Sequence, residues 1–325
     1  DRDTSGHGTL LASISAGSYA DGYVGVAPGA ELLVVKLKQS KQYLRDFFLI
    51  KDDVPAFEES DIMLALRFLE DYAIRLGKPL IIIFGLGSAN GSRTGASPLA
   101  EMMENLTKKP NISVITCMGN EANNKCHYKG TVMSALVPDV MEINVDGTGK
   151  GFTMEIWADS LDILSVSIES PSGEYVPRIP ARMGASMEYT FLYEGSTVTV
   201  DYQITENVAG MEVIFVRLKT PVEGTWKFYI YSLTNIKGSY NAWLPLKQFS
   251  GQDIYFLKSD PDTTLTVPAA ADGVISVGAY NHYTGAAYYE SGRGYSADGR
   301  IKPDFVAPGA GVYAVSYTHL TLPTN

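Results

Sequence analysis

The 325-residue sequence predicts an α/β fold, in which a parallel sheet with helices on both faces is interrupted by an all-β, jelly-roll-like insertion. Helix-like and strand-like segments alternate over the first 140 residues, which is typical of a parallel sheet. Short runs of alternating polarity then follow without helices, which is typical of a β-sandwich or jelly roll. A buried strand-like run returns at residues 273–279. The β block therefore interrupts the α/β domain instead of following it.

The first part of the chain contains three helix-like and three strand-like segments. Gly17 ends the first helix, which is small and apolar, and Gly77 ends the second, whose apolar residues recur at helical spacing. Ser97 and Pro98 fit the cap and first position of the third helix. Residues 80–84 form a continuous apolar run, typical of a parallel strand covered on both faces. In chain order the segments are helix 8–16, strand 32–37, helix 60–76, strand 80–84, helix 98–107 and strand 112–116.

The β block consists of short runs separated by turn residues such as Pro171-Ser172-Gly173. The runs are 153–157, 165–169, 197–202, 212–216 and 226–231. We therefore expect a first part of the α/β domain at 1–140, the β insertion at 141–249, a second part of the α/β domain at 250–314 and a tail at 315–325.

The two ends of the chain predict a fragment of a longer protein. The sequence begins at Asp1 without Met, and the tail 315–325 shows no apolar period of 2 or 3.6. DNA encoding the stem of this tail would resemble a transposase sequencing adaptor read in frame, whereas the alternative is an ordinary C-terminal extension. We expect an adaptor-derived artefact, which sets His319 aside as a functional residue.

Composition excludes several classes of partner. The net charge of −10 and a pI of about 4.9 argue against nucleic acid, which is bound by basic patches. The longest apolar run is too short to span a bilayer. Two cysteines are too few for a disulfide framework, and Cys117, Cys126 and His127 lack the spacing of a metal site. We expect no metal and no cofactor.

His7 is the first candidate for chemistry. It lies between two glycines, in Gly6-His7-Gly8-Thr9, directly before the first helix. The pKa of histidine lies near neutrality, so an accessible imidazole here suits general acid–base catalysis. The alternative is a histidine that caps or packs against the helix. His127 and His282 lie in polar, loop-like surroundings instead.

Two further candidates follow predicted strands. Asn120 comes after strand 112–116, at the edge where open α/β sheets bind ligands, and its amide could donate to an oxyanion. The alternative is a turn asparagine. Gly85-Leu86-Gly87 comes after strand 80–84 with the wrong spacing for a dinucleotide fingerprint, but it could pair with an extended peptide by strand addition.

Three other motifs give weaker evidence of a functional site. Gly294-Tyr295-Ser296-Ala297-Asp298 nearly matches a nucleophile elbow but ends in Asp, so we reject it. Residues 302–309 are rich in turn residues and by themselves predict a loop. Asp1 and Asp3 are too close to His7 in sequence to be assigned as its catalytic partner, and we interpret both as loop carboxylates.

The order of these motifs resembles that of the subtilisin-like serine peptidases. The matching segments are 4–9, 25–30, 85–87, 119–121 and 302–309. Within the family the chain is most similar to clostridial spore-germination (Csp-type) proteases of bacteria, which carry a jelly-roll insertion between the histidine and serine motifs. The resemblance covers residues 1–314.

The resemblance implies a serine endopeptidase that acts on proteins or peptides through an acyl-enzyme. It implies that His7 is the catalytic histidine, Asn120 the oxyanion-hole asparagine, and Gly85, Leu86 and Gly87 the strand that lines the primary pocket. It also implies that residues 302–309 lie just before a Gly-Thr-Ser motif. The aspartate motif would precede residue 1, and the tail begins where the Gly-Thr-Ser motif should follow, so only the histidine of the triad lies in this sequence. We expect this chain to be inactive and its intact parent to be active.

Two other functions compete with this one. A catalytically dead pseudoprotease would act as a signalling or scaffold partner. A binding role for the β insertion, with carbohydrate as ligand, would use Trp157, Trp226 and Trp243. All three lie in or beside strand-like apolar runs, so we expect them in the core of the insertion.

Overall fold

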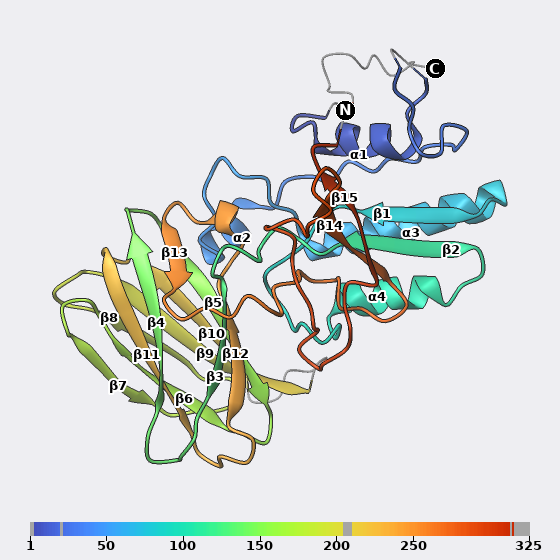
Figure 1. Ribbon diagram of the computed structural model, residues 1–325. Helices are drawn as coiled ribbons and strands as arrows, with labels where there is room; N and C mark the ends of the chain where they lie inside the picture. Colours follow the sequence, from blue (N-terminus) through green and yellow to red (C-terminus); the bar gives the residue numbers. More distant parts are fainter. Residues whose placement is uncertain (1–2, 20–21, 204–209, 313, 315–325) are drawn as a thin grey trace.

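The strands of the computed structural model, which describes residues 3–19, 22–203, 210–312 and 314, form three sheets (Figure 1). One is a four-stranded sheet with the order β1-β2-β14-β15, and every neighbouring pair in it is parallel. Its strands are β1 (Leu80–Phe84), β2 (Ile112–Cys117), β14 (Ile275–Asn281) and β15 (Phe305–Ala310). The long excursion between β2 and β14 contains the other two sheets, so a parallel sheet is interrupted by antiparallel strands as predicted.

Three of the helices begin and end within one residue of the predicted bounds. They are α1 (His7–Ala16), α3 (Glu59–Leu76) and α4 (Pro98–Thr107). The Ser97 hydroxyl accepts the Ala100 N–H at 3.1 Å and caps α4. Gly77 ends α3 with φ 62°, a conformation that glycine adopts without strain. A short helix, α2 (Gln42–Phe47), was not predicted.

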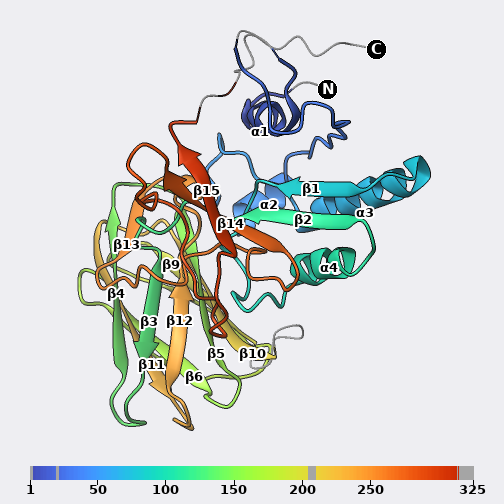
Figure 2. The ribbon, with the colours of Figure 1, turned by 45° about the vertical axis from the view of Figure 1, so that its right-hand side comes forward.

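The predicted cover of helices on both faces of the parallel sheet is wrong for the described residues. Ile82 and Phe84 of β1 pack against α3 and α4, which lie on the same side of the sheet (Figure 2). Ile81 and Ile83 point to the other face and are 65% and 48% exposed. The apolar run made β1 look covered on both sides, but a run of this kind cannot show whether a second layer is present.

Two predictions of secondary structure are also corrected. Residues 32–37 alternate between exposed and half-buried positions, as a strand would, but pair with no strand in the described part of the chain. A strand needs a neighbour for its backbone hydrogen bonds, and a pattern of side chains does not supply one. Conversely, 305–310 is not a loop but β15, which runs parallel to β14 at the edge of the sheet, where Pro308 is tolerated.

The antiparallel strands form a six-stranded and a five-stranded sheet, which share one core. The six-stranded sheet has the order β3 (His127–Thr131), β12 (Ser239–Trp243), β5 (Gly151–Asp159), β10 (Met211–Lys219), β9 (Thr197–Gln203) and β8 (Ser186–Thr190). The five-stranded sheet has the order β13 (Asp253–Phe256), β4 (Asp139–Asp146), β11 (Gly224–Ser232), β6 (Leu164–Glu169) and β7 (Tyr175–Ile179). Ile156 and Ile214 from the first sheet meet Val166 and Phe228 from the second, which makes a β-sandwich.

The sandwich includes strands on both sides of the predicted 141–249 segment. β3 and β13 belong to its two sheets, so the antiparallel strands extend from His127 to Phe256. A 3-10 turn, η1 (Lys247–Phe249), leads to β13. None of the helices within the described ranges is long and apolar enough to cross a membrane.

Candidate active site

His7 is the first residue of α1 and faces the end of β1. Gly6 precedes it with φ 77° and turns the chain into the helix. The imidazole is exposed, and its Nε2 atom lies 2.9 Å from the Gly85 carbonyl oxygen. The structure thus brings together two of the predicted site segments, the histidine and the glycine strand that follows β1.

The carboxylate of Asp3 holds the turn that carries His7. One oxygen accepts the backbone N–H groups of Ser5 at 3.0 Å and Gly6 at 2.9 Å, and the other accepts the N–H and hydroxyl of Thr9 at 2.9 and 2.8 Å. These bonds, above all the one from the Thr9 N–H, hold the pKa of Asp3 far below its usual range. Asp3 therefore caps α1, a more specific role than the loop carboxylate predicted. An acidic residue just before a helix was the available signal.

The glycines of Gly85-Leu86-Gly87 allow two close approaches. A Cβ atom on Gly85 would lie 2.4 Å from Leu11 of α1, and one on Gly87 would lie 2.2 Å from the Thr266 hydroxyl. Both distances are below any real contact, so a larger residue at position 85 would move the Leu11 side chain, and one at position 87 would move Thr266. Packing around the site therefore favours glycine most strongly at position 87.

The segment that carries Asn120 lies beside the glycine strand. The Cys117 thiol donates to the Leu86 carbonyl at 3.7 Å, and a Cβ on Gly119 would lie 2.5 Å from Thr266. The Asn120 side chain is exposed, and its backbone carbonyl accepts a hydrogen bond from Asn124 at 3.2 Å. No hydrogen bond joins the side chains of Asn120 and His7 in the described structure.

Thr266 is a residue that sequence reasoning missed. Its backbone N–H donates to the Met118 carbonyl at 3.0 Å, and Val267 and Ser88 exchange two backbone hydrogen bonds of 2.9 Å. The segment therefore bridges the ends of β1 and β2. No local pattern marks this role, because the contacts join residues more than 140 positions apart.

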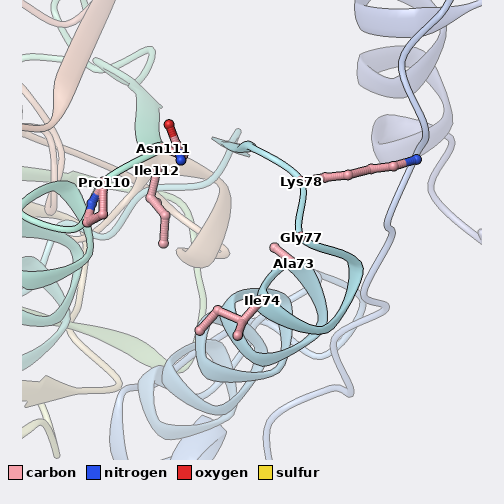
Figure 3. A pocket seen from close by; sticks show the side chains of 7 residues that line it. All are labelled: Ala73, Ile74, Gly77, Lys78, Pro110, Asn111 and Ile112. Carbon is pink, nitrogen blue, oxygen red and sulfur yellow. The ribbon is translucent and has the colours of Figure 1, made fainter.

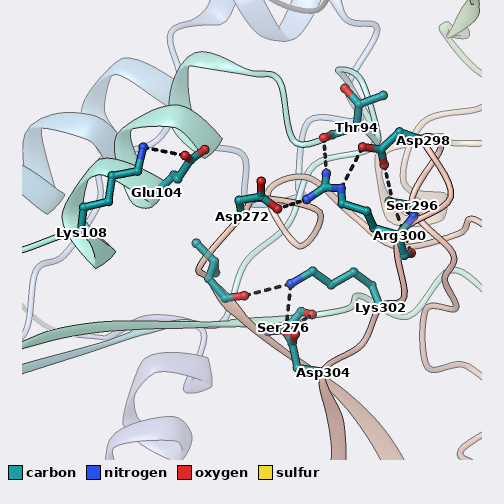
Figure 4. Close-up of polar contacts among 11 residues, drawn as sticks. Thr94, Glu104, Lys108, Asp272, Ser276, Ser296, Asp298, Arg300, Lys302 and Asp304 are labelled. Carbon is teal, nitrogen blue, oxygen red and sulfur yellow. Dashed lines mark hydrogen bonds and ion pairs between the residues drawn. The ribbon is translucent and has the colours of Figure 1, made fainter.

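A polar network fixes residues 302–309 to the parallel sheet (Figure 4). Lys302 donates to the Val274 carbonyl at 3.0 Å and to Asp304 at 2.9 Å, and Asp304 accepts the Ser276 N–H at 2.7 Å. Burial by itself would raise the pKa of Asp304, but the hydrogen bonds from Ser276 and Lys302 outweigh it and lower the pKa. Arg300 adds contacts to Asp298, Asp272 and the Thr94 carbonyl.

Residues that the sequence set aside have packing roles. Ser296 is buried and donates to Asp298 at 2.5 Å, which agrees with rejecting it as a nucleophile. Burial raises the pKa of the Cys126 thiol to about 12. His127 does not lie in a loop as predicted: it begins β3, stacks on Trp243, and has its pKa lowered by burial. Within the described ranges, no cluster of three or more His, Cys, Asp or Glu side chains could hold a metal ion.

A hollow elsewhere on the parallel sheet is not part of this site (Figure 3). It lies between the end of α3 and the start of β2, and Ala73, Gly77, Lys78 and Asn111 are among its lining residues. Leu80 and Ile112, next to it, are the first residues of their strands, whereas His7 lies at the opposite ends. The residues 315–325 and Asp1 lie outside the described structure.

Comparison with known proteins agrees with this geometry. The model of the subtilase family (peptidase S8) matches residues 1–148 and 218–325. The solved structure of the CspB protease of Clostridium perfringens is similar, with 25% identity and a TM-score of 0.83 over 98% of this chain. The chain spans 65% of the length of that protease. No curated protein matches the sequence significantly. Family match and shared fold together establish that the chain belongs to the subtilase family.

Proposed function

We propose that this chain belongs to a serine endopeptidase of the subtilisin type, with His7 as its general base and acid. The observation that carries the proposal is the position of the imidazole, exposed at the start of α1 with Nε2 against Gly85 at the carboxyl end of β1. Ligands of open α/β sheets bind at this end of the strands. A histidine there can reach a substrate held along the glycine strand.

His7 would move one proton in each half of the reaction. It takes the proton of the attacking serine hydroxyl as the acyl-enzyme forms and returns it to the leaving amine. In the second half it activates water in the same way. The serine nucleophile and the aspartate that orients the imidazole are assigned to no described residue, so these roles are expectations from the family.

Substrate would bind as an extended strand beside residues 85–87. Among the described strands β1 is the edge of its sheet, which leaves one side open to a peptide. Asn120, exposed after β2, would donate its amide N–H to the oxyanion of the tetrahedral intermediate. No cofactor takes part in this chemistry.

The β insertion, whose strands extend from His127 to Phe256, would brace the catalytic part of the chain on either side of it. The carboxylate of Glu155 in β5 accepts the Gly91 N–H at 2.8 Å, and the Arg93 guanidinium lies 4.5 Å from the centre of the Trp243 ring. Trp157, Trp226 and Trp243 are 5%, 0% and 2% exposed, so none offers a ring face to carbohydrate. This burial supports the structural role over the binding role.

The test uses the full-length protein and a pair of histidine variants. His7→Ala is expected to lower kcat/KM on a peptide substrate by about three orders of magnitude or more, because the general base is lost. His282→Ala is the control, since His282 is exposed and its ring contacts Tyr283. Equal rates for both variants would remove His7 from the mechanism.

Labelling with a fluorophosphonate probe distinguishes a peptidase function from a pseudoprotease function. The probe labels an activated serine, so the full-length protein should be labelled and the His7→Ala variant should not be. A full-length protein that is folded but neither labelled nor active would favour the pseudoprotease.

A further inference from the structure

Asn120, the proposed donor to the oxyanion, is exposed and directly precedes a turn at residues 121–124. The Asn124 N–H closes this turn by donating to the Glu121 carbonyl at 3.1 Å. A donor to an oxyanion is effective only when it is held in place before the charge develops. The groups that hold the backbone of Asn120 therefore bear on the reaction as well as on the fold.

Backbone groups from a distant segment hold the chain on both sides of Asn120. The Gly119 carbonyl accepts the Gly292 N–H at 2.8 Å, and the Ala122 N–H donates to the Glu290 carbonyl at 3.2 Å. The Asn120 carbonyl lies between these two bonds and is held in a different way, by a side chain.

The Asn124 side chain is the group that holds this carbonyl. Its Nδ2 atom donates to the Asn120 carbonyl at 3.2 Å and to the Glu121 Oε2 atom at 2.9 Å. Both partners are oxygen acceptors, and an amide nitrogen has two hydrogens to donate, so the two bonds use its full donor capacity. Asn124 therefore ties the backbone of Asn120 to the side chain of Glu121.

The Glu121 carboxylate is in turn held by other parts of the chain. Burial raises its pKa, while the Asn124 amide, the Lys247 N–H and the Arg93 guanidinium favour its charged form. Arg93 lies in the segment that continues the glycine strand, and Lys247 begins η1, between β12 and β13 of the sandwich. The link from Asn120 through Asn124 thus ends on a carboxylate that faces two other segments.

We propose that Asn124 is a positioning residue, which holds Asn120 so that its amide N–H is aimed at the oxyanion before the charge develops. This inference rests on the proposed peptidase function. In this role Asn124 touches neither the substrate nor the reacting atoms, and it acts through Asn120 alone. Its loss should lower kcat and leave KM nearly unchanged, because the contact with the oxyanion is made only in the transition state.

The experiment measures kcat and KM of the full-length protein on a chromogenic peptide substrate. Asn124→Ala should lower kcat about 10- to 100-fold and change KM by less than about twofold, because a small displacement of an aligned group is costly. Asn123→Ala is the matched control, since Asn123 is exposed and its side chain forms no hydrogen bond in the described structure. Its kcat should equal that of the wild type.

A double-mutant cycle tests whether Asn124 acts through Asn120. Asn120→Ala by itself should lower kcat about 100- to 1000-fold. Adding Asn124→Ala should lower kcat by less than about twofold more, because no amide is left to position. If the two losses multiply instead, Asn124 acts independently of Asn120 and the proposal is overturned.

A second pair of variants decides the question if Asn124→Ala fails to fold, as judged by circular dichroism. Asn124→Asp keeps the shape of the side chain but replaces the donor with a carboxylate. Asn123→Asp adds the same charge at the neighbouring position. Only Asn124→Asp should lower kcat, and an equal loss in both variants would overturn the proposal.

The outcomes distinguish the two proposals. An active protein whose kcat is the same in the wild type, Asn124→Ala and Asn124→Asp would overturn the positioning role and leave the peptidase intact. A loss that appears in KM alone would do the same. A full-length protein that is folded but cleaves no peptide and resists the fluorophosphonate probe would overturn the peptidase, and the positioning role with it.

Discussion

Asp3 shows how one side chain positions His7, the proposed general base. Its two carboxylate oxygens accept the N–H groups of Ser5, Gly6 and Thr9 and the hydroxyls of Ser5 and Thr9, so five hydrogen bonds fix the turn that carries His7. The helix dipole favours a negative charge at the same place. Loss of this carboxylate should loosen the first turn of α1 rather than the sheet behind it.

Asp3→Ala is expected to destabilise the protein by about 1 kcal/mol, as loss of a helix cap does. The folded pKa of Asp3 is lowered, so its contribution is complete above the unfolded pKa of about 3.9 and is lost as the pH falls below it. Urea unfolding should therefore show the full stability difference between the wild type and Asp3→Ala at pH 7 and a smaller difference at pH 2, because the contribution is lost only as the pH falls toward the lowered folded pKa. An equal difference at both pH values would contradict the charged cap.

Sequence reasoning nominated those candidate site residues whose chemistry is visible locally. His7 stands between two glycines before a helix, and Asn120 follows a strand, so residue type and position suffice to nominate them. Thr266 carries no such mark, because its importance comes from Gly87 and Gly119, which are distant in sequence. A single sequence does not show which distant glycine a threonine will meet.

Among the elements, β10 holds an unusual buried acid. Glu212 is fully buried, accepts the Leu164 N–H at 2.9 Å, and leaves its Oε1 atom without a partner in the described structure. Burial, with the nearby charge of Asp162 adding to it, raises the pKa of Glu212 to about 8. The acid thus links β10 to the start of β6 in its neutral form.

Glu212→Gln should make stability less dependent on pH. The folded pKa is raised, so the stability from the neutral acid is complete below about pH 4.3 and is lost as the pH rises to about 8. The amide does not ionise, so the free energy of unfolding of the variant should exceed that of the wild type by roughly 2–4 kcal/mol at pH 8 and match it near pH 4. Urea unfolding at both pH values measures this difference in the free energy of unfolding. Glu188→Gln, at an exposed glutamate, is the control. If the free energy of unfolding of Glu212→Gln depended on pH in the same way as that of the wild type, the raised pKa of Glu212 would be contradicted.

On the scale of the whole molecule, the chain contains two main cores of different kinds. One lies inside the β-sandwich and includes Trp226 and Phe228, and the other lies between the parallel sheet and helices α3 and α4. The sandwich buries both inner faces of its sheets, whereas the parallel sheet leaves Ile81 and Ile83 exposed. We expect the part with the open face to be the less stable.

Unfolding of this chain should therefore occur in two steps. All three tryptophans lie in the sandwich strands, while the three longest helices, α1, α3 and α4, lie with the parallel sheet. Helical circular dichroism at 222 nm should be lost at a lower urea concentration than tryptophan fluorescence changes. Coincident transitions would indicate one cooperative unit.

The sequence by itself determined most of the elements, their order and the residue types of the candidate site segments. Apolar periodicity, caps and glycine stops are local, and they predicted α3, α4, β1 and β2 to within a residue or two. Tertiary structure decided which face of the sheet is covered, that residues 305–310 form a strand while 32–37 do not, and that Thr266 meets two glycines. The reason is that pairing, layering and close approach depend on partners far along the chain, and a local pattern states only what a segment can do if a partner is present.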